Sequence, residues 1–339
     1  MRILFIAHSH YPRIGGVEYV VKSVAERLAR VGHEIAVVAG EPSTDKPREG
    51  IVEGVRVIRW PVWSPGNAYH IPKMRSELKR LLRELANQVD VVHVHSVHSI
   101  FTVYAGLVVA YSNVSSRIVV TSHYHGTGHT FARRVLWIFW RWRVAELLKK
   151  ANTVHAVSKR EASTLASHYP EARCKIAVIP NGVDEDVLSY TWKGQSSNYM
   201  VYAGRVEKYK RLELAVDVAK ELNLKLLIIG KGPYRERLVR YAGKVYRGGV
   251  EFLDLQPREK YLELVSRARY AINPSKHEAF SIFTAEALTI GTPVIVSMEI
   301  AENLEARARP LVRDLVIAEK APIRTWNEIL QLYLDKLYQ

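Results

Sequence analysis

Residues 270–297 have the sequence YAINPSKHEAFSIFTAEALTIGTPVIVS, and their pattern decides the fold class. Tyr270–Asn273 is a short apolar run that predicts a strand, and Glu278–Ile290 is a longer apolar segment that predicts a helix. Pro293–Ser297 is again short and rich in β-branched residues, which predicts a second strand. Two strands joined by a helix in this way form a parallel pair with a right-handed crossover.

The same alternation of short apolar and longer amphipathic segments runs through the chain in two series. The first series predicts strands at 2–7, 34–39, 55–59, 89–95, 117–122, 153–157 and 176–179, with helices at 17–31, 72–88, 96–111 and 133–150. The second predicts strands at 199–203, 224–229, 250–253, 270–273 and 293–297, with helices at 211–222, 234–243, 258–268 and 278–290. Two such series predict an α/β protein with two doubly wound domains.

The boundary between the two series is expected in the polar segment 184–198, which contains Gly194 and two serines. We therefore assign residues 1–185 to a first domain and 186–320 to a second, with a final helical segment at 321–339. Ligands of doubly wound sheets bind beyond the carboxyl ends of the strands. In a protein of two such domains, the expected site is the cleft between them.

The composition is that of a globular protein with an excess of positive charge. Of 339 residues, 49 are Lys or Arg and 34 are Asp or Glu, which gives a net charge of +15 and favours anionic partners. With 48% hydrophobic residues, the chain is neither disordered nor a coiled coil. Cys174 is the only cysteine, which excludes an intramolecular disulfide and a cysteine-ligated zinc site.

One segment has the length and apolarity of a membrane span, and it needs a separate interpretation. Residues 91–116 contain no Asp, Glu, Lys or Arg, but they include three histidines and several serines. We predict a buried strand followed by a buried helix. The apolar run at residues 3–7 is too short for a secretory signal, so we expect a cytoplasmic protein.

Two glutamates, Glu278 and Glu286, are separated by seven residues. On a single helix they would be about 80° apart and two turns apart, near one face. Glu286 is flanked by Ala285 and Ala287, and a carboxylate in such apolar surroundings needs hydroxyl or cationic partners.

Two further strand ends carry groups suited to an anion. Gly15 and Gly16 follow the first strand and begin the first helix, where backbone N–H groups are available. A tight turn into a helix is the alternative explanation. Arg205 and Lys210 follow the strand at 199–203 and are suited to clamp a diphosphate, although a solvated basic loop explains them equally well. The chain contains neither the dinucleotide fingerprint G-x-G-x-x-G nor a P-loop.

Eight of the thirteen histidines are expected along one edge of the first sheet, namely His8, His10, His93, His95, His98, His123, His125 and His129. A metal site is one explanation, but no set of carboxylates lies at ligand spacing and no H-E-x-x-H motif occurs. We therefore predict no metal, and we expect core imidazoles with one or two histidines that contact a polar ligand.

Six motifs in this order resemble the retaining glycosyltransferases of family four, the glycosyl transferases of group 1. They are GGVE at 15–18, VTSHYHG at 120–126, IPNGVD at 179–184, AGR-x4-K at 203–210, IIGKGP at 228–233 and PSKHEAFSIFTAEALTIGTPVI at 274–295. The resemblance covers roughly residues 1–297. It implies the GT-B fold, in which two Rossmann-like domains face each other across a cleft, and the final helix is expected to cross back to the first domain.

The resemblance also implies a role for each matching residue. Its activity would be transfer of a sugar from a nucleoside-diphosphate sugar to an acceptor hydroxyl with retention of configuration. Arg205 and Lys210 would neutralise the diphosphate. Glu278 would hold sugar hydroxyls, and Glu286 the ribose hydroxyls. His123 would lie at the anomeric centre. The remaining donor contacts would come from Gly15, Gly16 and the backbone N–H groups of Phe280, Ser281 and Ile282. No cofactor and no metal would be needed.

The sequence departs from the family pattern at two places. Ala279 and Ser281 stand where the family often has glycine, so the loop must avoid positive φ there or tolerate strain. After Ser297 the family commonly has a Gly-Gly turn and an acidic residue, and this chain has Met298-Glu299-Ile300-Ala301 instead. Glu302 and Glu305 are candidate replacements.

The predicted helix at 133–150 suggests where an acceptor is met. It contains three tryptophans, one phenylalanine and six basic residues, a composition typical of a helix that lies on an anionic lipid surface. A partly buried helix with tryptophans packed inside is the alternative. We expect a sugar or lipid-linked acceptor, peripheral binding at the inner membrane face and no nucleic acid.

Two other classes remain as alternatives. A non-catalytic binder of anions or nucleic acid would explain the +15 charge but gives no role to Glu286. An NAD-dependent sugar-modifying enzyme would share the doubly wound sheets but lacks its glycine fingerprint.

Overall fold

The structure is a computed structural model that describes residues 1–339 except 14, 66–68, 125, 127–130 and 277. For residues 131–136 it describes the backbone and not the side chains. The chain forms two compact units. Unit 1 comprises residues 1–181 and 326–339, and unit 2 comprises residues 182–325. The division at Gly182 precedes the polar segment in which the sequence predicts the boundary.

Unit 1 is built on a mostly parallel sheet with the strand order β3-β4-β2-β1-β6-β7-β8-β9. The antiparallel exceptions are β3 and β5, which both pair with β4. The strands are β1 (Arg2–Ala7), β2 (Glu34–Glu41), β3 (Arg48–Val52), β4 (Val55–Trp63), β5 (Ile71–Pro72), β6 (Val91–His95), β7 (Arg117–Thr121), β8 (Thr153–Ala156) and β9 (Ile176–Val178). This order places the first strand of the chain in the middle of the sheet, as in a doubly wound fold.

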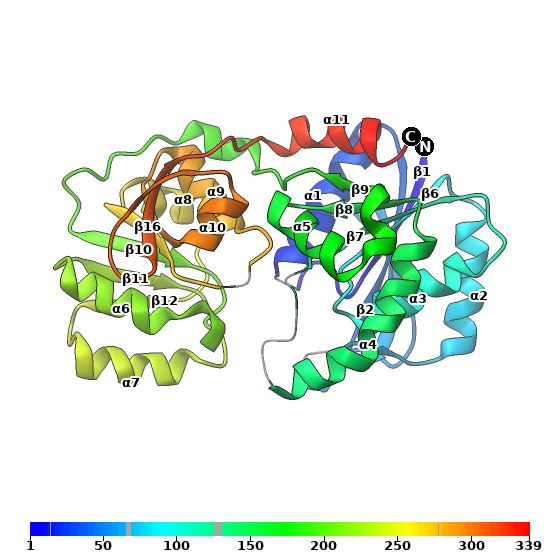
Figure 1. Cartoon of the computed structure of the whole chain (residues 1–339), viewed down its shortest axis with the longest axis horizontal. Coiled ribbons are helices and arrows are strands. Elements are labelled where there is room, and N and C mark those ends of the chain that lie inside the picture. The colour runs from blue at the N-terminus through cyan, green and yellow to red at the C-terminus, as the bar shows by residue number, and fades with distance from the viewer. Residues whose placement is uncertain (14, 66–68, 125, 127–130, 277) are drawn as a thin grey trace. The chain divides into compact units, whose positions relative to one another are not determined.

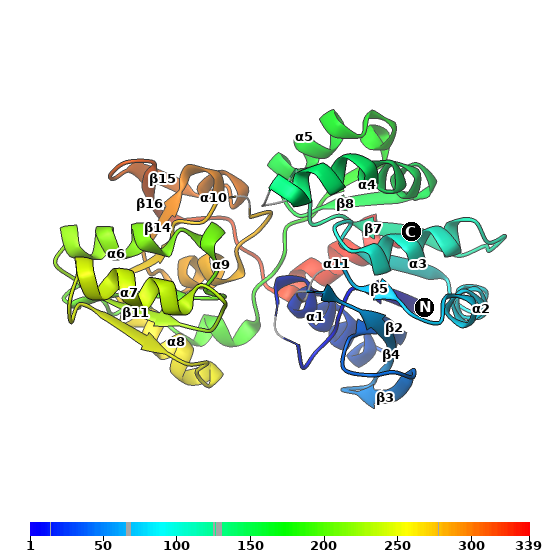
Figure 2. The same ribbon diagram turned by 90° about the horizontal axis from the view of Figure 1, so that it is seen from below.

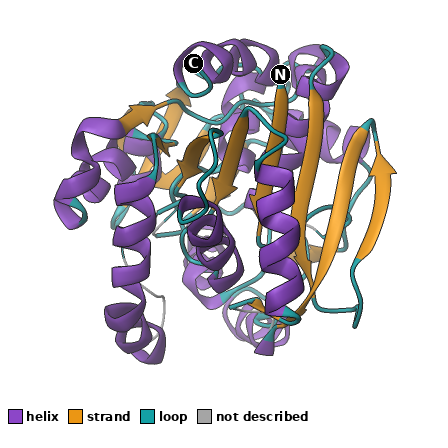
Figure 3. Ribbon diagram, turned by 90° about the vertical axis from the view of Figure 1, so that its right-hand side faces the viewer, coloured by secondary structure: helices purple, strands orange, loops and turns teal. Residues whose placement is uncertain are grey.

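Helices cover both faces of this sheet (Figure 3). They are α1 (Gly16–Arg30), α2 (Arg75–Ala86), α3 (Ile100–Ala110), α4 (Phe131–Lys150), α5 (Lys159–His168) and α11 (Trp326–Lys336), with a 3-10 turn η2 (Pro170–Lys175). Successive residues of β1 point to opposite faces, so Leu4 and Ile6 belong to one apolar cluster and Ile3 and Phe5 to another.

The C-terminal helix α11 belongs to unit 1 and lies beside α1 (Figure 1). Its Trp326, Ile329 and Tyr333 are fully or almost fully buried in the cluster that also contains Ile3 and Phe5. The two ends of the chain are thus joined in one core. Burying these large side chains removes apolar surface from water, which is the main favourable term in folding.

Unit 2 has a sheet of order β12-β11-β10-β13-β14-β16-β15, parallel except at the pairs of β16 with β14 and β15. The strands are β10 (Tyr199–Ala203), β11 (Lys225–Ile229), β12 (Val250–Leu253), β13 (Tyr270–Asn273), β14 (Val294–Ser297), β15 (Arg307–Pro310) and β16 (Leu315–Lys320). Between them lie η3 (Glu185–Ser189), η4 (Lys208–Lys210), α6 (Leu212–Glu221), α7 (Arg235–Val245), α8 (Arg258–Ser266), α9 (Ile282–Ile290) and α10 (Met298–Asn303). Helices α6 and α7 lie side by side in Figure 2, and α8 contacts α9.

The fold confirms the two α/β domains, but three helices begin three or more residues later than predicted. The helix expected at 72–88 is Arg75–Ala86, because Ile71 and Pro72 pair with β4 as a short strand. The helix expected at 96–111 is Ile100–Ala110. The charge-free segment 91–116 is β6 followed by α3, as predicted, and among the described residues no helix is both long and apolar enough to cross a bilayer.

Candidate functional site

The third helix whose start moves belongs to the motif that contains Glu278 and Glu286. Helix α9 begins at Ile282, so the prediction that Glu278 and Glu286 share one helix is wrong. Ser281 ends the preceding loop: its Oγ accepts from the Thr284 backbone N–H at 3.4 Å and so caps the helix. Glu278 therefore lies in the loop between β13 and α9, and only Glu286 is helical.

The substituted loop positions adopt ordinary backbone conformations. Ser281 has a φ of −103°, and Ala279 is not among the residues with positive φ. The loop thus avoids the strain that a Cβ would suffer in a left-handed conformation. Ser281 also accepts a hydrogen bond from the Asn273 side chain at 2.9 Å, which ties the start of α9 to the end of β13.

Glu278 and Lys210 form a buried ion pair in this loop region. Lys210 Nζ lies 2.7 Å from Glu278 Oε1, and the two side chains are 14% and 12% exposed. Burial alone would raise the pKa of Glu278, but the charge and hydrogen bond of Lys210 bring that pKa below its ordinary value. Burial alone would lower the pKa of Lys210, but the charge and hydrogen bond of Glu278, together with Tyr209 and Tyr202, raise it. Both groups are charged at neutral pH.

Arg205 lies on the same loop as Lys210 but is much more accessible. Its side chain is 60% exposed, and its Nη1 lies 3.0 Å from Glu207 Oε1. An exposed pair of this kind contributes little to stability. The guanidinium is therefore available to exchange Glu207 for an anionic ligand at small cost.

A residue that the sequence analysis missed supports the loop from behind. The Asn303 side chain donates to the backbone carbonyl of Glu278 at 2.5 Å. Asn303 is the last residue of α10, which Ser297 caps by accepting from the Ile300 backbone N–H at 3.4 Å. A short capped helix thus replaces the expected Gly-Gly turn, while nothing in the structure assigns a donor-site role to Glu302 or Glu305.

Glu286 has the cationic and hydroxyl partners that its position demands. It is 3% exposed; Arg258 Nη1 lies 2.5 Å from Oε1, and the Tyr261 hydroxyl donates to Oε2 at 2.5 Å. Burial raises the pKa of Glu286, and the charge of Arg258 opposes that shift. Arg258 also makes two hydrogen bonds to Asp186 at 2.8 and 2.9 Å. Sequence reasoning did not single out Arg258 or Asp186, because their pairing spans 72 residues.

The remaining two predicted donor residues of unit 2 lie at the start of α9. Phe280 is half-buried and packs against the unit 2 core, and Ile282 is the first helical residue. The first N–H groups of a helix lack intrahelical acceptors, so this end suits an anion or a hydroxyl. Beside this helix end, Lys210, Glu278 and Ser281 form one hydrogen-bonded group, because the Asn273 side chain donates to both Glu278 and Ser281.

The other predicted residues, Gly15, Gly16 and His123, belong to unit 1. Gly15 precedes α1 in an extended conformation, and a Cβ there would come within 2.3 Å of Glu18 Oε2. Glu18 is held by His8 at 3.1 Å and by the Ser9 hydroxyl, and these hydrogen bonds, against the effect of burial, lower its pKa to about 2. An anion at this helix end would meet a fixed carboxylate, so the structure gives the Gly15–Gly16 loop less support as a phosphate site.

His123 follows β7 and has a φ of +47°. Its Nε2 lies 3.4 Å from Nδ1 of His95, the last residue of β6. The adjacent ends of β6 and β7 thus bring these two imidazoles together, as expected for neighbouring parallel strands.

Several of the predicted edge histidines are core residues. His93 is fully buried, with Nδ1 2.8 Å from the Tyr338 hydroxyl and Nε2 2.6 Å from the Thr121 hydroxyl. Burial keeps the pKa values of His93 and His95 well below the usual range. His125 and His129 lie outside the described residues. Among the described part of the chain, no cluster of three or more potential metal ligands occurs.

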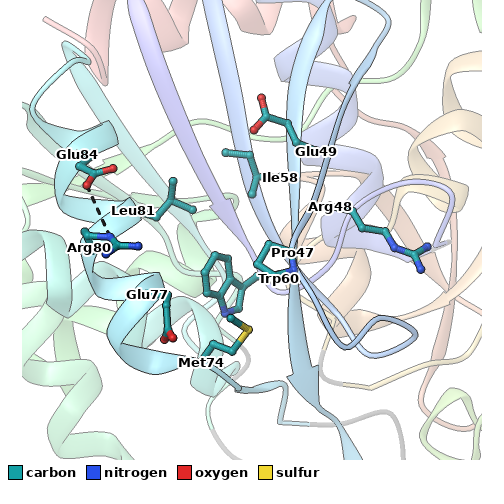
Figure 4. A pocket seen from close by; sticks show the side chains of 10 residues that line it. All are labelled: Pro47, Arg48, Glu49, Ile58, Trp60, Met74, Glu77, Arg80, Leu81 and Glu84. Carbon is teal, nitrogen blue, oxygen red and sulfur yellow. Dashed lines mark ion pairs between the residues drawn. The ribbon is translucent and has the colours of Figure 1, made fainter.

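A separate pocket lies on unit 1, between β3, β4 and α2 (Figure 4). Its lining residues are Pro47, Arg48, Glu49, Ile58, Trp60, Met74, Glu77, Arg80, Leu81 and Glu84. None of them is a predicted site residue, and charges of both signs line it. This pocket is distinct from the groups described above.

Sequence comparison shows which family this chain of two doubly wound units belongs to. The profile of Glycosyltransferase Family 4 matches residues 14–187, and that of Glycosyl transferases group 1 matches residues 191–335. The chain belongs to this family of glycosyltransferases, with the group 1 domain as its second half. It is a nucleotide-sugar glycosyltransferase of group 1.

Individual relatives are distant but similar over most of their length. A GDP-mannose-dependent alpha-mannosyltransferase of Mycolicibacterium smegmatis is 27% identical over 311 residues, which are 87% of this chain and 79% of that protein. Sucrose-phosphate synthase from Thermosynechococcus elongatus superposes with a TM-score of 0.70 at 20% identity, covering 88% and 82% of the two chains. Anabaena HepE in complex with UDP-glucose gives 0.67 at 15% identity, covering 99% and 89%. These structures share the GT-B fold, and the two alternative classes are set aside.

Proposed function

We propose that this enzyme transfers a hexose from a nucleoside-diphosphate sugar to an acceptor hydroxyl with retention of the anomeric configuration. The observation that carries the proposal is the buried Lys210–Glu278 pair beside the N-terminus of α9 in unit 2. Each charge has a partner in the reaction: the ammonium suits a diphosphate, and the carboxylate suits sugar hydroxyls.

The chemistry explains why a cation is needed there. Breaking the anomeric C–O bond develops positive charge on the sugar and negative charge on the diphosphate. Preorganised cations and helix N–H groups stabilise the developing negative charge without reorganisation. Lys210 is fixed by Glu278, and the exposed Arg205 is able to move onto the diphosphate. We propose that these two cations take the place of a divalent metal.

Glu286 is the proposed ribose ligand. Its two oxygens are oriented by Arg258 and Tyr261, and a carboxylate oxygen has lone pairs left for a ribose hydroxyl. Arg258 opposes the effect of burial on Glu286 and so favours the charged carboxylate, which is the stronger acceptor. In unit 1, His123 is the proposed contact to the sugar at the anomeric centre.

The acceptor is proposed to be lipid-linked, because helix α4 exposes an apolar face. Ile138, Phe139 and Trp142 are 58%, 75% and 76% exposed; the first two lie four and three residues before Trp142, which places them on its side of the helix. Exposed Arg141 and Arg143 flank them. Trp137 instead packs on Tyr124, so the helix is partly buried and partly suited to an anionic lipid surface. We propose peripheral binding at the inner membrane face through this surface.

The experiment that tests the proposed reaction uses GDP-mannose and UDP-glucose as donors, with excess EDTA present. Release of GDP or UDP should persist in EDTA and fall strongly in Lys210→Ala, while Lys260→Ala, an exposed lysine of α8, should not change it. The anomeric configuration of the product, read from the one-bond 13C–1H coupling of its anomeric carbon, should match that of the donor. Release that requires a divalent metal, or a product of inverted configuration, would contradict the proposal.

A further inference from the structure

The backbone at His123 is unusual and must be held in place by its surroundings. A φ of +47° lies in the left-handed region, which non-glycine residues adopt only when neighbouring interactions support it. Both neighbours of His123, Ser122 and Tyr124, are buried. The same carboxylate binds both of them.

That carboxylate belongs to Glu161 in the first turn of α5. Its Oε1 accepts from the Ser122 hydroxyl and from the Tyr124 backbone N–H, the latter at 2.5 Å. Its Oε2 accepts from the Val157 backbone N–H at 2.7 Å. Glu161 is 3% exposed, so these bonds are made away from water.

Glu161 makes more interactions than its helix requires. Ser158 caps α5 by accepting from the Glu161 backbone N–H at 3.1 Å, which is one half of a capping box. In a complete box, the glutamate side chain would bond back to the N–H of the capping serine. Here it turns instead to the Val157 N–H and to the two residues that flank His123. The helix end alone does not explain this direction.

A carboxylate buried with only neutral partners is costly for a folded protein. Among the described residues, its partners are one hydroxyl and two backbone N–H groups. Burial raises the pKa of Glu161 to about 7, against the lowering effect of these hydrogen bonds.

The segment is fixed on its other sides as well. The Tyr124 ring lies 5.6 Å from the Tyr169 ring and 5.9 Å from the Trp137 ring, and its hydroxyl lies 2.7 Å from His168 Nδ1. The imidazole of His123 itself faces His95 at 3.4 Å. Glu161 holds the backbone on both sides of His123, and His95 contacts the His123 ring. Together these contacts restrict the His123 side chain to one orientation.

We propose that Glu161 is the positioning residue of His123: it holds the residues on both sides of it and thereby directs the imidazole toward the transferred sugar. This inference rests on the proposed function, which places His123 at the anomeric centre. Misplacement of a reacting or contacting group by about 1 Å costs on the order of 100-fold in rate. The proposal therefore predicts an effect on kcat that passes through His123.

The test compares Glu161→Gln, His123→Ala and the double variant by GDP or UDP release from GDP-mannose and UDP-glucose. Glu161→Gln should lower kcat about 10- to 100-fold with little change in the KM of the donor. The double variant should be no slower than His123→Ala alone. The matched control is Glu26→Gln, a buried glutamate of α1 that pairs with Lys22 and Arg30 and should keep the wild-type kcat.

Losses that multiply in the double variant, or a wild-type kcat in Glu161→Gln, would overturn the inference. A wild-type kcat in His123→Ala would instead overturn the proposed role of His123, so the two failures are distinguishable. If Glu161→Gln does not fold, Ser122→Ala removes only one of the three bonds and should give a smaller kcat loss that disappears in the His123→Ala background.

A second readout does not depend on turnover. In a two-dimensional 1H–15N spectrum of the imidazole nitrogens, the His123 signal is the one lost in His123→Ala. It should shift in Glu161→Gln and stay in place in Glu26→Gln. An unmoved His123 signal in Glu161→Gln would contradict a positioning role.

Discussion

Lys210 and Glu278 lie 2.7 Å apart and are 68 residues apart in the sequence, which makes them a buried link between the end of β10 and the end of β13. These strands are neighbours in the unit 2 sheet, so their carboxyl ends meet at one edge. The position of the pair follows from the strand order. The two charged residues are far apart in the sequence, so no local sequence pattern predicts that they form a pair.

Breaking this pair should be more harmful than removing it. Lys210→Met or Glu278→Gln alone leaves a buried charge without its partner, and each should lower the free energy of unfolding of unit 2 by about 3–5 kcal/mol. The double variant Lys210→Met/Glu278→Gln should lose clearly less than the sum of the two. Urea unfolding of the four proteins measures the coupling, and strictly additive losses would show that the pair does not interact.

Asn303 should matter for turnover through the loop that it holds. Asn303→Ala leaves the Glu278 carbonyl without its side-chain donor, and a buried unsatisfied acceptor costs about 1–3 kcal/mol. We expect a loss of kcat in GDP or UDP release that exceeds the loss seen in Asn327→Ala, a control on α11. Equal kcat for Asn303→Ala and the wild type would mean that the loop does not depend on this contact.

Unit 1 should lose stability as the pH falls from about 6.5 to 4. Burial, with further contributions from nearby positive charges at His10 and His70, lowers the pKa values of His10, His70 and His155 to about 4. Below pH 6.5 these histidines become protonated in the unfolded chain but stay neutral in the folded unit. Their contribution to the free energy of unfolding is therefore complete above pH 6.5 and is lost as the pH falls toward 4. Over this range, each imidazole lowers the free energy of unfolding by up to about 1.4 kcal/mol for each pH unit of acidification.

Tryptophan fluorescence can follow this transition, because every tryptophan except Trp192 belongs to unit 1. Urea midpoints at pH 7.5, 6.5, 5.5 and 4.5 should fall steadily below pH 6.5. The variant His70→Gln should show a shallower fall, since it titrates one group fewer. Identical midpoints at pH 7.5 and 4.5 would be incompatible with buried neutral histidines.

The exposed face of α4 should bind anionic vesicles. We expect the protein to co-sediment with phosphatidylglycerol vesicles at low salt, and Phe139→Ser/Trp142→Ser to reduce the bound fraction strongly. Trp63→Ser is the matched control, because Trp63 is also an exposed aromatic residue of unit 1, with 60% of its surface accessible, but it lies on β4. Equal sedimentation of the two variants would show that α4 is not the contact surface.

Much of the fold was predictable because the strands of both sheets are short apolar runs separated by helical segments. The start of α9 was not, since Ala279 and Phe280 extend the apolar pattern into a loop that Ser281 ends by capping. A hydrogen bond from the Thr284 backbone N–H to the Ser281 side chain decides the boundary, and periodicity does not contain that information.

The candidate site divides in the same way. Motif spacing and the family resemblance predict Lys210, Glu278 and Glu286 as site residues, and the structure gives each a charged partner. Arg258, Asp186, Asn303 and Glu161 were not identified, because each acts through contacts between segments far apart in the chain. Glu161 does have a local sequence signal, because it stands three residues after Ser158 as in a capping box. That spacing predicts a hydrogen bond to the Ser158 N–H, whereas the Glu161 side chain accepts from the Val157 N–H and from Ser122 and Tyr124.

The most direct test of the account is thermal unfolding with UDP, GDP, ADP and NAD, for the wild type and for Glu286→Ala. A nucleotide at about 100 times its dissociation constant stabilises the folded protein by roughly 2.7 kcal/mol. The account predicts a rise in Tm with one nucleoside diphosphate, lost in Glu286→Ala and kept in Glu263→Ala, a partly exposed glutamate of α8 that pairs with Lys260 and Arg267. A rise with NAD alone, or an equal rise in Glu286→Ala, would contradict it.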